Sequence, residues 1–404
     1  MARPRRTLIV TGPPYVFGGV AFMTRWLADD LERRGHRITV AHYATLGREP
    51  DLSAGIAGVL AGRQPAVRRY RDWGGKDFVA VGCRLPEIES NYYRDSDLWR
   101  ELVEAHDHHV AVGGTLPVAW PLTAAGVPHL VWCASDVDGD RDERRRAMNL
   151  PRLLFEKTVV GPRLADLERR VLAGPGRILA ISEFTRNRLR SIVGRAERAI
   201  VRLPIPIDLD RFHPPDSPPT PGVIGCAGRL TDPRKNLDLL LDAVAILHRS
   251  NVAVRLELAG DVPADLGPRT ERLGIADKVV SRGRLDDDAY AAFHRGIDVL
   301  AIPSTQEGHN IVGIEAMASG VPVVATRCGG PEDFVENGVT GHLTGFAAKE
   351  LADGLARVIL DRARRAAMGG AARRMVEAEY GFDAFRRVFD AEWSAAWSAH
   401  AGGP

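Results

Sequence analysis

Residues Ser304–Gly320 read STQEGHNIVGIEAMASG and lie between two apolar runs. The preceding run, DVLAIPS, has the length and composition of a buried strand, and VPVVAT after it has the same character. Asn310 is a good N-cap and the apolar stripe begins at Ile311, so we expect a helix to begin near His309 or Asn310. This order of strand, loop, helix and strand predicts a parallel α/β sheet.

Two glutamates stand at the start of this predicted helix. Glu307 lies in the loop before the helix, and Glu315 lies inside it. The positive end of a helix favours an anion between them, and carboxylates accept hydrogen bonds from paired hydroxyls. The pattern suits a ligand with hydroxyls at two ends and phosphate in the middle, such as a nucleotide-diphosphate sugar. Taken singly, each glutamate is more typical of a surface residue.

The chain is too long, at 404 residues, for one ordinary core. Short apolar runs alternate with amphipathic segments from TLIVTG onward, and a second alternation begins at GVIGCAGRL. Between them, PIPIDLDRFHPPDSPPTPG is too rich in proline for a helix or a central strand. We therefore expect two doubly wound α/β domains that face a cleft. The predicted bounds are 1–203, a linker at 204–221, 222–380, and a final helix at 381–404 that packs back onto the first domain.

Two further segments suit phosphate. In CAGRLTDPRKNLDLLL a strand ends near Gly228, and Arg229 and Lys235 follow it, so two cations stand where a diphosphate can bind. In PPYVFGGVAF, Gly18 and Gly19 let the backbone approach a ligand at a helix N-terminus. The alternatives are an arginine on a solvated loop and a plain tight turn. The spacing G-x-G-x-x-G of dinucleotide folds is absent.

Composition and charge exclude several classes of protein. No apolar run reaches about 18 residues, and the apolar part of the N-terminal stretch is too short for a signal peptide. The four cysteines have no metal-binding spacing, which favours buried thiols in a reducing cytoplasm. The net charge of +2 divides into +7 over residues 1–200 and −5 over the remainder. The basic half suits an anionic acceptor or the inner face of a membrane, or it is simply a solvated surface.

Three segments of the first half have less specific patterns. Asp136, Asp138 and Asp140 alternate as metal ligands do, but a charged loop leading into a helix is the favoured interpretation. The aromatic and arginine-rich segments Asn91–Arg100 and Arg68–Gly75 are candidates for an acceptor site or for packed loops.

Five motifs in this order resemble the GT-B glycosyltransferases, specifically the large retaining family four (glycosyl transferases group 1). They are GGVAFMTRWLADDLERRGHRITV, ISEFTRNRL, GRLTDPRKNLDLLLDAVAIL, QEGHNIVGIEAMASGVPVVAT and GGPEDFVENGVTGHL. The resemblance implies a first domain that binds a hydroxyl-bearing acceptor and a second that binds a nucleotide-sugar donor. It also implies transfer with retention of anomeric configuration and without a metal or other cofactor, and no nucleic-acid partner.

Carried over by position, the resemblance implies roles for individual residues. Arg229 and Lys235 would hold the donor diphosphate, Gly19, next to Gly18, would approach the same phosphates, Glu307 would touch the transferred sugar, and Glu315 would bind the ribose. The backbone from Gly308 through His309, Asn310 and Ile311 to Val312 would contact sugar and phosphate. Asp136 would act near the acceptor or the donor sugar.

One departure from the family pattern keeps alternatives open. Many members have a His-Asp pair after the strand that here reads PHLVWCA, whereas this chain has Ser135 followed by Asp136. His109 and His129 are possible substitutes, although both are more typical of strand ends. The rival functions are a GT-B nucleotide-sugar epimerase and a scaffold protein without turnover. Uridine is the favoured base, with guanosine as the alternative, and the sugar, the acceptor and the oligomeric state stay open.

Overall fold

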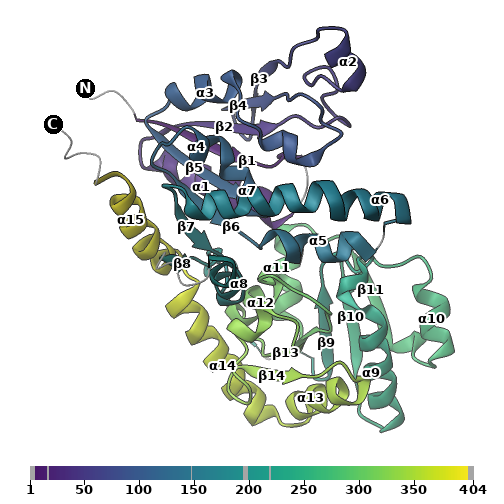
Figure 1. Ribbon diagram of the computed structural model, residues 1–404. Coiled ribbons are helices and arrows are strands. Elements are labelled where there is room, and N and C mark those ends of the chain that lie inside the picture. The colour runs from purple at the N-terminus through teal and green to yellow at the C-terminus, as the bar shows by residue number, and fades with distance from the viewer. Residues whose placement is uncertain (1–4, 16–17, 147, 194–198, 218–219, 399–404) are drawn as a thin grey trace. The chain divides into compact units, whose positions relative to one another are not determined.

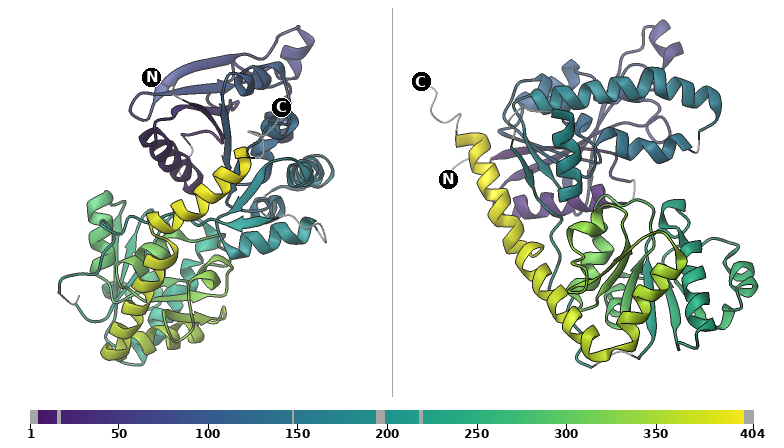
Figure 2. Two further views of the ribbon diagram at one scale, coloured as in Figure 1. Left: turned by 90° about the vertical axis from the view of Figure 1, so that its left-hand side faces the viewer. Right: turned by 60° about the horizontal axis from the view of Figure 1, so that its bottom comes forward.

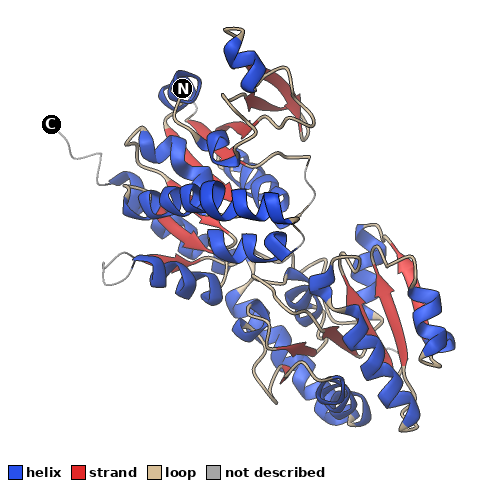
Figure 3. Cartoon of the chain, turned by 45° about the vertical axis from the view of Figure 1, so that its right-hand side comes forward, coloured by secondary structure: helices blue, strands red, loops and turns tan. Residues whose placement is uncertain are grey.

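The computed structural model describes residues 5–15, 18–146, 148–193, 199–217 and 220–398, and it divides into two compact units (Figure 1). The first unit takes in the chain up to Ile181, then Thr185–Leu203 and the chain from Phe389 onward. The second takes in Ser182–Phe184 and Pro204–Val388. Each unit is built on a sheet flanked by helices (Figure 3), which confirms the predicted α/β fold class. Residues 218–219 of the predicted linker and 399–404 of the predicted last helix lie outside the described residues.

The sheet of the first unit has eight strands in the order β3-β4-β2-β1-β5-β6-β7-β8. All neighbouring pairs are parallel except β3 and β4, which form an antiparallel hairpin at one edge. The strands are β1 (Arg6–Thr11), β2 (Arg37–Tyr43), β3 (Val67–Asp72), β4 (Lys76–Val81), β5 (His108–Gly113), β6 (Leu130–Cys133), β7 (Arg177–Ala180) and β8 (Ile200–Arg202).

Helices cover both faces of this sheet. On one face, Trp99 and Leu102 of α3, Leu122 of α4 and Leu164 of α7 pack against alternate strand residues such as Leu8. On the other face lies α1, beside β1, β2 and β5. The helices and short helical turns are α1 (Gly19–Arg33), α2 (Ile56–Leu60), η1 (Glu89–Tyr93), α3 (Asp97–Glu104), η2 (Leu116–Ala119), α4 (Trp120–Ala124), α5 (Val137–Arg146), α6 (Leu150–Phe155), η3 (Glu156–Val160), α7 (Gly161–Ala173) and α8 (Glu183–Val193).

The sheet of the second unit has six parallel strands in the order β11-β10-β9-β12-β13-β14. They are β9 (Val223–Ala227), β10 (Arg255–Ala259), β11 (Val279–Gly283), β12 (Val299–Ile302), β13 (Val323–Thr326) and β14 (Gly341–Thr344). The helices are η4 (Pro233–Lys235), α9 (Leu237–Arg249), α10 (Leu266–Arg272), η5 (Ala276–Lys278), α11 (Asp287–Arg295), α12 (Ile311–Ala318), η6 (Gly330–Asp333), α13 (Ala348–Leu360), α14 (Arg362–Glu379) and α15 (Phe382–Ser398), whose end belongs to the first unit.

Residues of the second sheet alternate between two cores, which is why its strands are apolar throughout. Ile224 and Cys226 of β9 pack with α9 and α13, while Val223 and Ala227 pack with α11, α12 and α14. Gly225 faces the latter side because a Cβ there would lie 2.4 Å from the Ile297 side chain.

In both sheets the strand order reverses direction beside the first strand of the unit. The reversal lies between β1 and β5 in the first unit and between β9 and β12 in the second. In open α/β sheets the loops at the carboxyl ends of the strands splay apart at this point, which makes it the usual place for a ligand. We therefore expect a ligand site at the loops after β1, β5, β9 and β12.

The last helix, drawn in yellow in Figure 2, ends in an aromatic cluster of the first unit. Trp393 packs against His36, with ring centroids 5.4 Å apart, and stacks on His108 at 5.1 Å. Trp397 lies 4.9 Å from the same His108 ring. Burial lowers the pKa of His108 to about 4, and burial together with Arg5 and Arg34 lowers the pKa of His36. The cluster thus accommodates uncharged imidazoles.

This cluster predicts a loss of stability in acid. Both folded-state pKa values lie below the ordinary value of 6.5, so the unfolded chain binds more protons as the pH falls from about 6.5 towards 4. We expect the melting temperature to fall over this range, and to fall less in His108→Phe, which keeps the stacked ring but cannot take up a proton. Thermal unfolding followed by circular dichroism across this pH range measures both slopes. Equal slopes in the two proteins would contradict the assignment.

Candidate functional site

An ion pair joins the two strands that flank the reversal point of the second sheet. Lys235 follows β9, and its Nζ donates to Oε1 of Glu307, in the loop after β12, at 2.7 Å. Ser304 Oγ donates to the same oxygen at 2.6 Å. The lysine side chain is 20% exposed and the glutamate side chain 12%, so the pair is shielded from bulk water but still reachable. The structure thus brings together two of the predicted site residues.

The loop that carries Glu307 is held by a pair of glycines. The Glu307 N–H donates to the Cys328 carbonyl at 2.7 Å, and the Gly330 N–H donates to the Glu307 carbonyl at 2.8 Å. A Cβ on Gly329, whose φ is +105°, would lie 2.7 Å from the Glu307 oxygen, and one on Gly330 would lie 2.7 Å from the His309 backbone. Only glycine fits this close approach, so the GGPE segment fixes the position of the glutamate.

The helix after the loop begins as the sequence predicts. Asn310 adopts a left-handed conformation with φ of 60°, and its side chain accepts from the Gly313 N–H at 2.9 Å. This cap leaves the amides of Ile311 and Val312 as donors without a bond inside the described part of the chain. The side chain of His309 is buried against the Tyr380 ring, 6.1 Å between centroids. The helix start therefore offers backbone groups to an anion.

The second predicted cation, Arg229, extends into solvent. Its side chain is 70% exposed, and its nearest carboxylate is Asp232 at 4.0 Å. Asp232 is itself bound by Arg234, with 2.7 Å between Nη2 and Oδ2. The Lys235 side chain lies against Gly228, the residue before Arg229, because a Cβ on Gly228 would lie 3.6 Å from the lysine Cε. Arg229 and Lys235 thus both stand at the carboxyl end of β9.

Glu315 lies in an aromatic environment one turn inside α12. Tyr290 Oη of α11 donates to its Oε2 at 3.0 Å, and His294 Nε2 of the same helix lies 4.0 Å from that oxygen. Burial raises the pKa of Glu315 to about 8, so the carboxyl group is protonated at neutral pH. Tyr290 and His294 were not expected from the sequence. Their spacing of four residues on one helix face resembles that of ordinary core residues.

The loop after β1 in the first unit holds a polar cluster. Tyr15 Oη bonds Thr45 Oγ1 at 2.6 Å and donates to Glu49 Oε2 at 2.8 Å, and the Arg48 guanidinium lies 4.7 Å from the centre of the tyrosine ring. Burial raises the pKa of Tyr15 to about 12. The sequence places Tyr15 beside the glycine turn but does not single it out. Residues 16–17 of that turn lie outside the described residues.

The predicted glycines Gly18 and Gly19 stand at the start of α1 and are exposed. Apart from their chain neighbours and the backbone of α1 itself, no heavy atom of the described chain lies within 4 Å of a Cβ built on either residue. The first turn of α1 carries no acidic side chain. A side chain at either position would therefore point into open space, and binding of an anion at this turn stays a prediction.

The Asp136 side chain is buried, and both of its carboxylate oxygens accept hydrogen bonds. Its Oδ1 and Oδ2 accept from Arg188 Nε at 2.5 Å and Nη2 at 2.8 Å, and Oδ2 also accepts from the Gly139 N–H at 3.1 Å. This bidentate arginine–carboxylate pair anchors α8 to the start of α5. Its role near a substrate stays a prediction. Asp138 and Asp140 pair with Arg145 and Arg144, and they lie along α5.

The two aromatic segments of the first half have different surroundings. Tyr92 stacks on Tyr43 at 4.9 Å, and Tyr93 contacts the same ring edge-on at 5.4 Å, so the segment Asn91–Arg100 contributes to a packed aromatic cluster. Tyr70 of the segment Arg68–Gly75 bonds His42 Nε2 at 2.8 Å, and the rest of that segment forms the β3–β4 hairpin. A role in acceptor binding stays a prediction for both.

The four cysteines are free and buried, as expected for structural thiols. Among the residues that the structure describes, no helix is both long enough and apolar enough to cross a bilayer.

Comparison with known proteins establishes the family. The model of the family "Glycosyl transferases group 1" matches residues 221–361. A D-inositol 3-phosphate glycosyltransferase of Segniliparus rotundus is 30% identical over 354 residues, which cover 82% of this chain and 74% of that protein. The chain belongs to the glycosyl transferases group 1 family, and the resemblance seen in the motifs is confirmed.

Other relatives are similar over a shorter part or in fold alone. A GDP-mannose-dependent alpha-(1-6)-phosphatidylinositol monomannoside mannosyltransferase of Mycobacterium tuberculosis is 33% identical over 236 residues, 53% of this chain and 60% of that protein's length. Sucrose-phosphate synthase from Thermosynechococcus elongatus has a TM-score of 0.72 at 19% identity, with 98% of this chain and 100% of that chain covered. Anabaena HepE in complex with UDP has a TM-score of 0.69 at 19% identity, with 97% and 100% covered. These structures confirm the GT-B fold.

The surroundings of Glu315 predict a dependence of stability on pH. The folded-state pKa of about 8 exceeds the ordinary value of 4.5, so the folded protein holds a proton that the unfolded chain releases, and this contribution is lost as the pH rises from 4.5 through 8. We expect Glu315→Gln, which keeps the shape of the neutral acid, to melt several degrees above wild type near pH 8 and at the same temperature near pH 4.5.

Thermal unfolding of wild type, Glu315→Gln and Glu101→Gln tests this expectation. Glu101 is exposed on α3 and serves as the matched control. If Glu315→Gln melts with or below wild type near pH 8, the carboxyl group is ionised in the folded protein and the assignment is wrong.

Proposed function

We propose that this chain is a retaining glycosyltransferase that moves a sugar from a nucleoside diphosphate sugar to a hydroxyl group of an acceptor. The observation that carries the proposal is the Lys235–Glu307 pair at the reversal point of the second sheet. A cation that faces a carboxylate is suited to a donor with a diphosphate next to a polyhydroxylated ring. Membership of the glycosyl transferases group 1 family supports the same activity.

In the proposed reaction the second unit stabilises the departing diphosphate. Arg229 and Lys235 carry two positive charges at the carboxyl end of β9, and the amides at the start of α12 add the positive end of a helix. Such donors act where negative charge develops in the transition state. Glu307 accepts a hydrogen bond from a hydroxyl of the transferred sugar, and this bond fixes the orientation of the sugar. The leaving phosphate takes the proton of the acceptor hydroxyl on the same face of the sugar, so the anomeric configuration is kept.

No metal ion is part of the proposed mechanism. Metal-dependent transfer uses the ion to neutralise a diphosphate, and here Arg229 and Lys235 supply two cations for that purpose. We expect transfer to proceed unchanged in the presence of a chelator such as EDTA.

The acceptor is proposed to be a hydroxyl of a phosphorylated cyclitol, either free or as a lipid headgroup. The names of two relatives support this class, because one is named for D-inositol 3-phosphate and the other for phosphatidylinositol monomannoside. The excess of positive charge in residues 1–200 suits such an anion. The polar cluster around Tyr15, beside the start of α1, is the part of the first unit that we propose for it. A lipid-linked acceptor would place the protein at the inner face of the membrane.

The donor base is proposed to be uracil or guanine. The sequence favours uracil, whereas the mycobacterial relative is named for GDP-mannose. Side chains of the second unit discriminate weakly between them, because base recognition in such folds relies on backbone groups, here near Val279–Leu285.

Two rival functions make different predictions. An epimerase acts on the donor alone and needs no acceptor, so analysis of donor incubated without acceptor detects it. A scaffold protein shows no turnover with any pair of substrates. The scaffold alternative is motivated by the region of Asp136. Ser135 stands where many family members have histidine, and the Asp136 carboxylate is paired with Arg188.

The activity is tested with UDP- and GDP-sugars and inositol phosphate as acceptor. We expect Arg229→Ala and Glu307→Ala to lower the rate of transfer by roughly 10²- to 10³-fold, because the first loses a donor to the departing diphosphate and the second loses the acceptor that orients the sugar. Arg269→Ala, which removes a partly exposed arginine of α10 paired with Asp238, is the matched control and should retain full rate. Proton NMR of the anomeric signal gives the stereochemistry of the product.

A product with inverted configuration would contradict the retaining mechanism. Full activity in Arg229→Ala and Glu307→Ala would mean that the site is misplaced. Conversion of donor alone to a new nucleotide sugar would favour the epimerase.

A further inference from the structure

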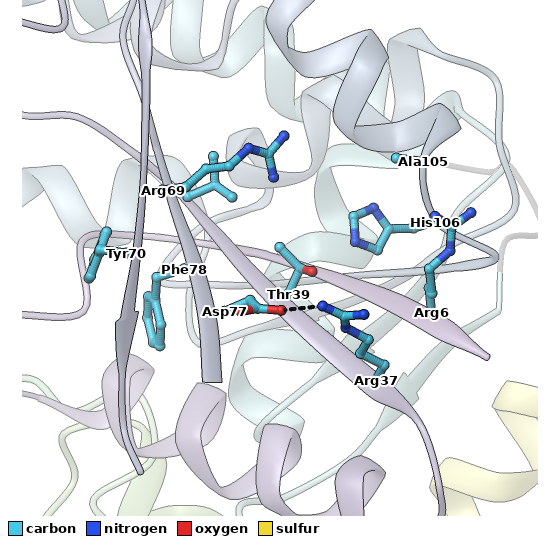
Figure 4. Close-up of a pocket in the computed structure, with 10 residues that line it drawn as sticks. Arg6, Arg37, Thr39, Arg69, Tyr70, Asp77, Phe78, Ala105 and His106 are labelled. Carbon is cyan, nitrogen blue, oxygen red and sulfur yellow. Dashed lines mark hydrogen bonds and ion pairs between the residues drawn. The ribbon is translucent and has the colours of Figure 1, made fainter. Parts of the chain in front are cut away.

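A pocket in the first unit has no part in the function proposed above. It encloses about 370 Å³ over one face of the sheet, which is large enough for a small ligand. Figure 4 shows Arg69 on one side of it, Arg6 and His106 on the other, and Thr39 between them. Asp77, Phe78, Val79, Tyr70, Arg37 and Ala105 complete the lining.

The pocket exists because α3 covers only part of the sheet face. Trp99 and Leu102 of this helix pack over the middle of the strands, with Leu8 and Val79. The helix ends at Glu104, and the chain turns back to the sheet through Ala105 and His106. The first residues of β1, β2 and β4 lie beyond its reach, and strand register places Arg6 opposite Arg37 and Thr39 opposite Asp77.

The lining of the pocket is strongly positive. The lining holds Arg6, Arg37 and Arg69 but only one carboxylate, that of Asp77, while the Asp107 carboxylate accepts from the Arg6 backbone N–H at 2.8 Å. Arg37 Nη2 and Arg71 Nε approach the Asp77 carboxylate at 3.1 and 3.4 Å, so one acid already serves two arginines. Within the described residues, the Nε–H of Arg6 is buried without a hydrogen-bond partner, and Arg69 has no carboxylate within 4.0 Å. An excess of guanidinium donors around a cavity is complementary to a multiply charged oxyanion.

Protection of the sheet edge explains only part of this arrangement. Charged side chains on an edge strand keep sheets from associating, and β3 is an edge strand, so Arg69 and Arg71 suit that role. Arg37 and Arg6 belong to β2 and β1 in the interior of the sheet, where no edge needs protection. Protection of a sheet edge therefore does not explain why Arg6 and Arg37 lie over the same face as Arg69.

The pocket is also separate from the edge of the sheet at which the reaction is proposed. Arg6 and Arg37 are the first residues of the parallel strands β1 and β2, whereas Tyr15, Gly18 and Gly19 follow the carboxyl end of β1. The strand β1 runs from Arg6 to Thr11, so its whole length separates the two places.

We propose that this pocket is a binding site for a phosphate monoester, formed by Arg6, Arg37 and Arg69. A phosphate monoester carries nearly two negative charges and three acceptor oxygens near neutral pH, which match the excess charge and the number of guanidinium groups. A free phosphorylated metabolite and a lipid headgroup such as that of phosphatidic acid present the same group. The proposal does not rest on the proposed glycosyl transfer.

Calorimetric titration with inorganic phosphate tests the site in the full chain. We expect Arg69→Ala and Arg37→Ala to bind phosphate about tenfold more weakly than wild type, since a hydrogen bond to a charged partner is lost. Arg68→Ala is the matched control, because Arg68 is an exposed neighbour on the same strand whose side chain points to the opposite face and pairs with Asp51. Phosphate bound at the donor site is common to all four proteins and cancels in the comparison.

Cosedimentation with phosphatidylcholine vesicles, with and without phosphatidic acid, separates the two sources of the group. Binding to the phosphatidic acid vesicles that is lost in Arg69→Ala and kept in Arg68→Ala identifies a lipid headgroup. If Arg69→Ala and Arg37→Ala lose affinity for phosphate but wild type does not bind the phosphatidic acid vesicles, the ligand is a free phosphorylated molecule. Equal phosphate affinity in all four proteins, equal loss in Arg68→Ala and Arg69→Ala, or no phosphate binding at all would overturn the proposal.

Discussion

The ion pair between Lys235 and Glu307 is the interaction on which the site of the second unit depends. It connects segments 72 residues apart in sequence and ties the end of β9 to the loop after β12. Because a shielded charge without a partner is costly, each side chain keeps the other in place before any ligand arrives. In the proposed reaction, a phosphate that binds Lys235 would free Glu307 to accept a hydrogen bond from a sugar hydroxyl. The proposed function thus couples binding of the diphosphate to orientation of the sugar through one pair of side chains.

The two ends of a parallel sheet have different uses in this chain. Loops at the carboxyl ends carry the lysine, the glutamate and the start of α12 in one unit, and Tyr15 and the start of α1 in the other. The amino ends of the first sheet carry arginines instead, at positions where a helix leaves the sheet face open. The positive charge of the N-terminal half is thus gathered partly into a pocket rather than spread evenly over a solvated surface. The Lys235–Glu307 pair and the Arg6–Arg37–Arg69 pocket are therefore proposed as sites for different ligands.

Features that depend on neighbours in the sequence could be predicted, and features that depend on distant partners could not. The cap at Asn310 and the parallel strands follow from local pattern, and so does the place of Glu307 in a loop. The protonation of Glu315 depends on burial that no local pattern shows, and it persists although Tyr290, 25 residues away, donates a hydrogen bond that lowers the pKa of the carboxyl group. The pairing of Asp136 with Arg188 spans 52 residues. The antiparallel strand β3 was missed because VRRYRD carries too many charges to read as a strand.

The proposed function requires that the second unit bind a nucleoside diphosphate through Lys235, the partner of Glu307. Calorimetric titration of wild type and Lys235→Ala with UDP, GDP and ADP tests it most directly. We expect UDP or GDP to bind wild type with a dissociation constant in the micromolar range and to bind Lys235→Ala at least about tenfold more weakly. Equal affinity in the two proteins, or no binding of any of the three nucleotides to wild type, would contradict it.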